Sequence, residues 1–116
     1  IQRLYSRLEK LVEQMQQVID EREAPVRLVR LLDQYNDQSL QHFAMEEELM
    51  LLADYPDYAD HKRMHDQSIN YSIHLNGEEL LRDPQAGDAL VSNLRGWLST
   101  HIEADRSLSH YLQQRC

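Results

Sequence analysis

The sequence has few of the residues that interrupt or cross-link a chain. It contains three glycines, three prolines and a single cysteine, Cys116, at the last position. One cysteine cannot form an internal disulfide, which fits a reducing compartment, so we expect a cytoplasmic protein. No stretch approaches the roughly 18 to 20 consecutive apolar residues that span a bilayer, so no membrane-spanning helix is predicted.

Positive charge is also scarce. The 12 Lys and Arg residues are outnumbered by 20 Asp and Glu residues, which gives a net charge of −8. Nucleic acids and anionic membrane surfaces select for basic patches, so we expect neither as a partner. A chain of 116 residues suffices for one core, and we predict a single domain over residues 1–116. Because the chain does not begin with methionine, it could be part of a longer protein.

Apolar residues recur at intervals of three and four, the period of helices with one buried face. The period predicts a first helix that ends near residue 20 and a second from about residue 24 to 53. No segment shows the two-residue alternation of a strand. We therefore predict an all-α fold.

The second half of the chain continues the same period. A third helix should follow the turn at Tyr55-Pro56-Asp57, weaken at Asn76-Gly77 and end at Asp83-Pro84 and Gly87. A fourth should run from about Leu90 almost to the C-terminus. Four amphipathic helices with short connections are best buried as an antiparallel up-down-up-down four-helix bundle.

Polar side chains interrupt the apolar face of three predicted helices. The second helix carries His42 and Glu46, the third His61 and His65, and the fourth His101 and Asp105. The members of each pair are four residues apart, so both point the same way. Burying these groups unpaired would be costly, whereas one or two cations would satisfy all of them. Histidines and bridging carboxylates are what a di-iron site in a helical bundle needs.

Single features have simpler explanations. A lone histidine on an apolar face is more often a hydrogen-bonded core residue, so a purely structural bundle is an alternative. His74 and His110 fall off the pattern and are expected in solvent, and of the run Glu46-Glu47-Glu48 only Glu46 is expected to turn inward. Four apolar residues belong most simply to the core but could also wall a small pocket beside the ligands: Leu8, Phe43, Trp97 and Leu98.

These motifs resemble the hemerythrin family, whose members hold two non-haem irons inside a four-helix bundle. The matching features are HFxxEExxM from His42 to Met50, the Tyr55-Pro56 turn, HxxxH at His61 and His65, and WLxxHI from Trp97 to Ile102 followed by Asp105, Tyr111 and Leu112. The resemblance covers the whole chain.

The resemblance implies a ligand set. One iron would bind His61, His65 and His101, and the second would bind His42 and a histidine of the first helix. Glu46 and Asp105 would bridge the two irons together with an oxo or hydroxo group. In the family, the less crowded second iron is the one that binds dioxygen.

The sequence departs from the family pattern at two points. No histidine precedes residue 42, and alignment of the first helix puts Tyr5 where the family has one. Tyr5 is either a core aromatic or a phenolate ligand of the second metal, since an iron(III) charge favours the phenolate. His101 and Asp105 are four residues apart instead of five, which keeps both on one face but could alter the bridge.

Three functions fit this ligand set. The leading hypothesis is a bacterial domain that senses dioxygen, another small diatomic, peroxide or redox state and is fused to a signalling output domain. An alternative is a free-standing dioxygen carrier or storage protein. A third is a di-iron peroxidase or oxidase, but no substrate cleft is evident, so the domain by itself is not expected to be an enzyme. Manganese, zinc or cobalt would suit the same ligands.

Overall fold

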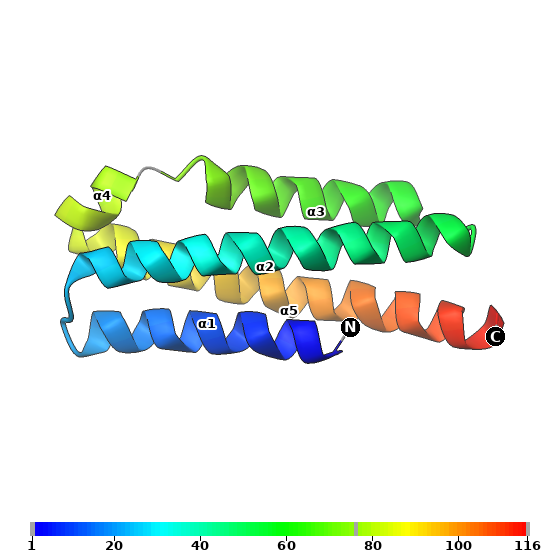
Figure 1. Cartoon of the computed structure of the whole chain (residues 1–116), viewed down its shortest axis with the longest axis horizontal. Helices are drawn as coiled ribbons and strands as arrows, with labels where there is room; N and C mark the ends of the chain where they lie inside the picture. Colours follow the sequence, from blue (N-terminus) through cyan, green and yellow to red (C-terminus); the bar gives the residue numbers. More distant parts are fainter. Residues whose placement is uncertain (1, 76, 116) are drawn as a thin grey trace.

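Helices that lie side by side along the long axis make up the molecule (Figure 1). The computed structural model describes residues 2–75 and 77–115, so Ile1, Asn76 and Cys116 lie outside the described residues. The elements are α1 (Gln2–Asp20), α2 (Pro25–Leu52), α3 (Tyr58–Ile73), α4 (Gly77–Arg82) and α5 (Pro84–Arg115). No strand occurs in these two ranges, and the all-α prediction is confirmed.

The four long helices pack against one another as neighbours. Both α2 and α5 pack against α1 and against α3. The short α4 lies at the end of the molecule where α2 and α5 begin (Figure 1). The molecule measures 48 × 22 × 19 Å. Among the helices of the described ranges, none combines the length and the apolar character that a membrane crossing requires.

Local backbone chemistry fixes where α2 begins and ends. Pro25 is its first residue, a position at which proline costs no hydrogen bond. At the other end Asp54 adopts a left-handed conformation with φ of 52°, and the N–H of Tyr55 donates to the carbonyl of Met50 at 2.9 Å. This is a Schellman-type ending, although aspartate replaces the usual glycine. Arg22, with φ of 53°, ends α1 in the same way.

The predicted third and fourth helices need correction. What was expected to be one weakened helix is two, because α3 ends at Ile73 and α4 starts at Gly77. Helix α5 starts at Pro84 rather than near Leu90, so Gly87 lies inside it. A Cβ atom at Gly87 would lie only 3.1 Å from Cδ2 of Leu28. The glycine thus leaves room beside α5 for the side chains of Leu28 and Ile19 and does not end a helix.

Two apolar clusters fill the bundle on either side of a polar layer. The larger cluster takes buried residues from α1, the first half of α2, α4 and the first half of α5. The smaller contains Met50, Tyr55 and Leu108. Residues 42–46 of α2 and residues 101–105 of α5 lie between the two clusters. The fold therefore places the predicted ligands in one layer.

Candidate metal centre

Three helices bring all six histidine and carboxylate candidates into this layer. They are His42 and Glu46 of α2, His61 and His65 of α3, and His101 and Asp105 of α5. All six are buried, with at most 5% of any residue exposed. The four-residue spacing on each helix aims both members of a pair inward, as the sequence indicated.

Glu46 lies at the centre of the layer. Its Oε1 atom is 3.0 Å from Nε2 of His61 and 3.1 Å from Nε2 of His65. The same oxygen is 3.6 Å from Nε2 of His101, while Oε2 contacts His42. One carboxylate therefore meets imidazoles from all three helices.

Asp105 spans the layer in a similar way. Its Oδ1 atom lies 3.1 Å from Nε2 of His101 and 3.4 Å from Nε2 of His61. Its Oδ2 atom lies 3.6 Å from Nε2 of His42. The four-residue spacing from His101 thus leaves the carboxylate in reach of histidines on two other helices.

The candidate ligand atoms form two overlapping groups. The first contains Glu46, His61, His65 and His101, and the second contains His42, Glu46, His101 and Asp105. Within each group the ligand atoms lie within 4.8 Å of one another. Metal–ligand bonds of about 2.0–2.2 Å put neighbouring ligand atoms about 3.0–3.5 Å apart, depending on geometry. The distances from the imidazole nitrogens to the oxygens of Glu46 and Asp105 fall in or near that range.

Hydrogen bonding alone leaves part of the layer unsatisfied. In the described part of the chain, Nε2 of His42, Oε2 of Glu46 and both Asp105 oxygens have close neighbours but no partner in hydrogen-bond geometry. Nε2 of His65 lies 3.3 Å from Nε2 of His101, so two nitrogens that could each act as an acceptor face one another. Groups that converge without pairing fit a cation between them. The donor set, imidazole with carboxylate, suits iron and other divalent first-row metals.

Histidines and carboxylates of the layer shift one another's pKa values when no cation is bound. Burial is the largest single influence and raises the pKa of Glu46, but the nearby imidazoles, led by His101 and His42, outweigh it and hold the pKa far below its usual range. Burial also raises the pKa of Asp105, but the nearby imidazoles outweigh it and lower the pKa to about 2. Although burial disfavours the imidazolium, the two carboxylates raise the pKa of His42 and of His61 to about 9. A metal ion would replace these protons, so binding should release them.

Aromatic rings pack against two of the imidazoles. Phe43 stacks on His65 with ring centroids 4.0 Å apart and planes at 9°. Trp97 stacks on His101 at 4.5 Å and 25°, and it meets Phe43 edge to face. These contacts restrict the rotation of both imidazoles and exclude water from their faces. The two aromatics expected as pocket walls therefore lie against the candidate ligands.

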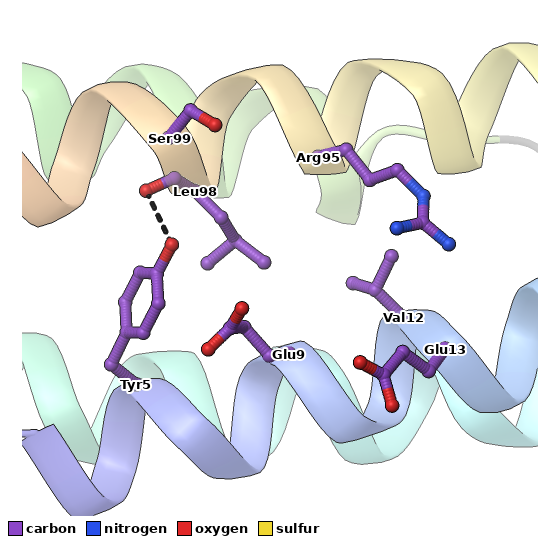
Figure 2. Close-up of a pocket in the computed structure, with 7 residues that line it drawn as sticks. All are labelled: Tyr5, Glu9, Val12, Glu13, Arg95, Leu98 and Ser99. Carbon is purple, nitrogen blue, oxygen red and sulfur yellow. Dashed lines mark hydrogen bonds between the residues drawn. The ribbon is translucent and has the colours of Figure 1, made fainter.

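Tyr5 lies beside the layer but is bonded elsewhere. Its half-buried side chain points from α1 towards α5, and the hydroxyl donates a hydrogen bond to the carbonyl oxygen of Leu98 at 2.9 Å (Figure 2). Tyr5 lines the cavity of about 260 Å³ drawn there, and also a neighbouring cavity of about 370 Å³ that reaches Asp105. Burial raises the pKa of Tyr5, and the charges of Glu9 and Asp105 raise it further. Leu8, one turn along α1, is fully buried in the larger apolar cluster.

The remaining histidines and glutamates lie largely where the sequence placed them. His74 and His110 are exposed, as predicted. Of the three consecutive glutamates only Glu46 is buried in the layer, but Glu47 is only partly exposed, and its Oε2 atom lies 3.0 Å from the outward Nδ1 of His65. Glu48 is exposed. Spacing along α2 could not reveal the Glu47 contact, since it depends on how α3 packs against α2.

A buried layer of imidazoles and carboxylates between packed helices defines a metal-binding helical domain. The hemerythrin HHE cation binding domain family matches residues 1–108, and the chain belongs to the hemerythrin family. Bacteriohemerythrin from Stenotrophomonas maltophilia (strain R551-3) is 38% identical in an alignment over 80 residues that covers 65% of this chain and 48% of that protein. The chain thus spans about half the length of this relative. No solved structure matches the chain.

Proposed function

We propose that this chain is an antiparallel up-down-up-down bundle that holds two iron ions and senses dioxygen or redox state. The observation that supports it most is the pair of overlapping ligand groups that share Glu46 and His101. Two cations about this shared carboxylate would satisfy the unpaired atoms of the layer. Bound iron would supply ferrous–ferric chemistry towards dioxygen, and the residues would bind, orient and shield it.

The two metal positions would differ in crowding. His61, His65 and His101 would hold the first ion, and Glu46 and Asp105 would bridge it to the second. The second position then keeps only His42 as a ligand of its own, which leaves room for an external ligand. Asp105, which would bridge to this position, shares a cavity with Tyr5.

Tyr5 is our candidate for a further ligand of the second ion. To bind, its hydroxyl must leave the carbonyl of Leu98 and lose its proton. The raised pKa of Tyr5 opposes that loss in the metal-free protein, whereas a nearby trivalent cation favours it. The alternative is that Tyr5 only packs α1 against α5 and the second position stays open.

A sensing role needs a route by which the site affects a partner. Helix α5 carries both His101 and Asp105 and continues to Arg115. A change in the charge or ligands of the ions would alter the contacts of these two side chains and so bias the position of α5. We propose that α5 transmits the signal to an output domain or partner and that the domain by itself is not an enzyme.

The visible spectrum of the air-oxidised protein, with iron counted by elemental analysis, tests the proposal. Two irons per chain are expected. If Tyr5 is a ligand, a broad phenolate-to-iron(III) band should vanish in Tyr5→Phe. The band should persist in Tyr71→Phe, because the Tyr71 side chain is exposed and its hydroxyl accepts a hydrogen bond from the Asn93 amide. No bound iron in the wild type would refute the proposal. Identical spectra for the wild type and Tyr5→Phe would show that Tyr5 only packs.

A further inference from the structure

His65 is restrained on three sides. Its imidazole is fully buried, and Phe43 stacks on its face. Its Nε2 atom points into the layer, 3.1 Å from Oε1 of Glu46. Its Nδ1 atom points away from the layer, 3.0 Å from Oε2 of Glu47. Two carboxylates therefore face opposite nitrogens of one ring.

A neutral imidazole carries one N–H and one lone pair, so it can donate to only one of these carboxylates. If Nε2 of His65 offers its lone pair to a cation in the layer, the proton must lie on Nδ1. Oε2 of Glu47 is placed to accept a hydrogen bond from that N–H. The arrangement thus matches the tautomer that metal binding requires.

Glu47 is itself held in place. Its side chain is only 21% exposed, and its Oε1 atom lies 3.6 Å from Nζ of Lys62. Lys62 also pairs with Asp66 at 3.1 Å, one turn further along α3. The Glu47 carboxylate of α2 therefore directs one oxygen at His65 and the other at Lys62, and both of these residues belong to α3.

Among the described residues, the Nδ1 atoms of two other histidines lack the carboxylate partner that Nδ1 of His65 has. In the described part of the chain, Nδ1 of His42 and Nδ1 of His101 have no hydrogen-bond partner. Glu47 thus distinguishes His65 from these two candidate ligands, and the difference arises from charge as well as from a hydrogen bond.

We propose that Glu47 is a positioning residue that fixes the Nδ1–H tautomer of His65 and increases the electron donation of its Nε2 to the bound metal. This inference rests on the proposed metal-binding function. A histidine ligand whose N–H is held by a carboxylate is a stronger donor, and loss of such an outer partner typically costs about 10–100-fold in metal affinity. An anionic partner should also favour the more highly charged state of the metal.

Two variants of Glu47 separate the effect of its hydrogen bond from the effect of its charge, and two variants of Glu48 serve as controls. Glu47→Ala removes both, whereas Glu47→Gln keeps a carbonyl acceptor and removes the charge. Glu48→Ala and Glu48→Gln are matched controls, because Glu48 is the adjacent, exposed glutamate of the same helix. Two quantities are measured on the full chain: anaerobic Fe(II) affinity by competition with a coloured chelator, and the midpoint potential of the iron-loaded protein.

We expect Glu47→Ala to bind Fe(II) about 10–100-fold more weakly than the wild type and Glu47→Gln to lose less. Both Glu47 variants should have a higher midpoint potential, since each lacks the anionic partner, and both Glu48 variants should match the wild type. The potential is the deciding quantity, because a role confined to helix packing would not shift it. Equal potentials in Glu47→Gln and Glu48→Gln would overturn the inference even if affinity fell.

The same experiment distinguishes this failure from failure of the proposed function. A wild-type protein that retains no Fe(II) against the chelator would refute the metal site itself. A wild type that holds iron, with Glu47→Ala indistinguishable from Glu48→Ala in both affinity and potential, would refute only the role of Glu47.

Discussion

Replacing Glu46 by glutamine should strongly destabilise the metal-free protein. Glu46 is completely buried, and its Oε1 atom lies 3.0 Å from His61 and 3.1 Å from His65. Its other oxygen contacts His42. Glutamine has nearly the same shape but no charge, so the substitution removes the anionic partner of several imidazoles without creating a cavity.

The size of the effect follows from this burial. Removing one partner of a buried ion pair costs about 3–5 kcal/mol, because the other charge is left uncompensated. For a domain of this size, about 4 °C of melting temperature per kcal/mol gives a decrease of about 12–20 °C. Glu46 also belongs to both candidate ligand groups, so iron retention should fall as well.

The assay is thermal unfolding by circular dichroism at pH 6 in chelator, followed by elemental analysis after iron loading. Glu48→Gln is the control, and it should change stability by no more than about 0.5 kcal/mol because the side chain is exposed. Equal melting temperatures for Glu46→Gln and Glu48→Gln in chelator would refute the reasoning, since they would mean that the buried charge contributes nothing.

Two further predictions concern pH and the individual ligands. The metal-free protein should be most stable between about pH 4 and 6.5. The stability that His42 contributes is complete below its unfolded pKa of 6.5 and disappears as pH rises through its folded pKa of about 9. The stability that Asp105 contributes disappears as pH falls from its unfolded pKa of 3.8 towards its folded pKa of about 2. Melting in chelator from pH 2 to 10 checks this, and a constant midpoint from pH 6.5 to 9 would contradict it. His61→Ala should lose bound iron and the stability that iron adds, whereas His74→Ala, at an exposed position, should lose neither, as measured by elemental analysis and melting with and without iron. Equal iron content in these two variants would exclude His61 as a ligand.

Features that lie within one helix were predictable from the sequence. The three-and-four period identified the long helices, and the four-residue spacings of His42 with Glu46 and of His101 with Asp105 put each pair on an inward face. Such inferences succeed because a regular helix fixes the relative directions of its own side chains.

Boundaries that depend on packing were less predictable. Glycine and proline are common where helices end, yet Pro84 is the first residue of α5 and Gly87 lies inside it. Proline suits the first turn of a helix, and Gly87 lies where Leu28 approaches closely. Residue identity alone does not say whether a glycine ends a helix or permits close contact.

The sequence by itself determined the all-α class, the six buried candidate ligands and the family. Only the tertiary structure decided that Glu47 contacts His65 and that the hydroxyl of Tyr5 bonds to Leu98. Both contacts join side chains to a different helix, so they depend on the register and rotation of one helix against another. The packing of the whole core sets those quantities, and no spacing within a single helix encodes them.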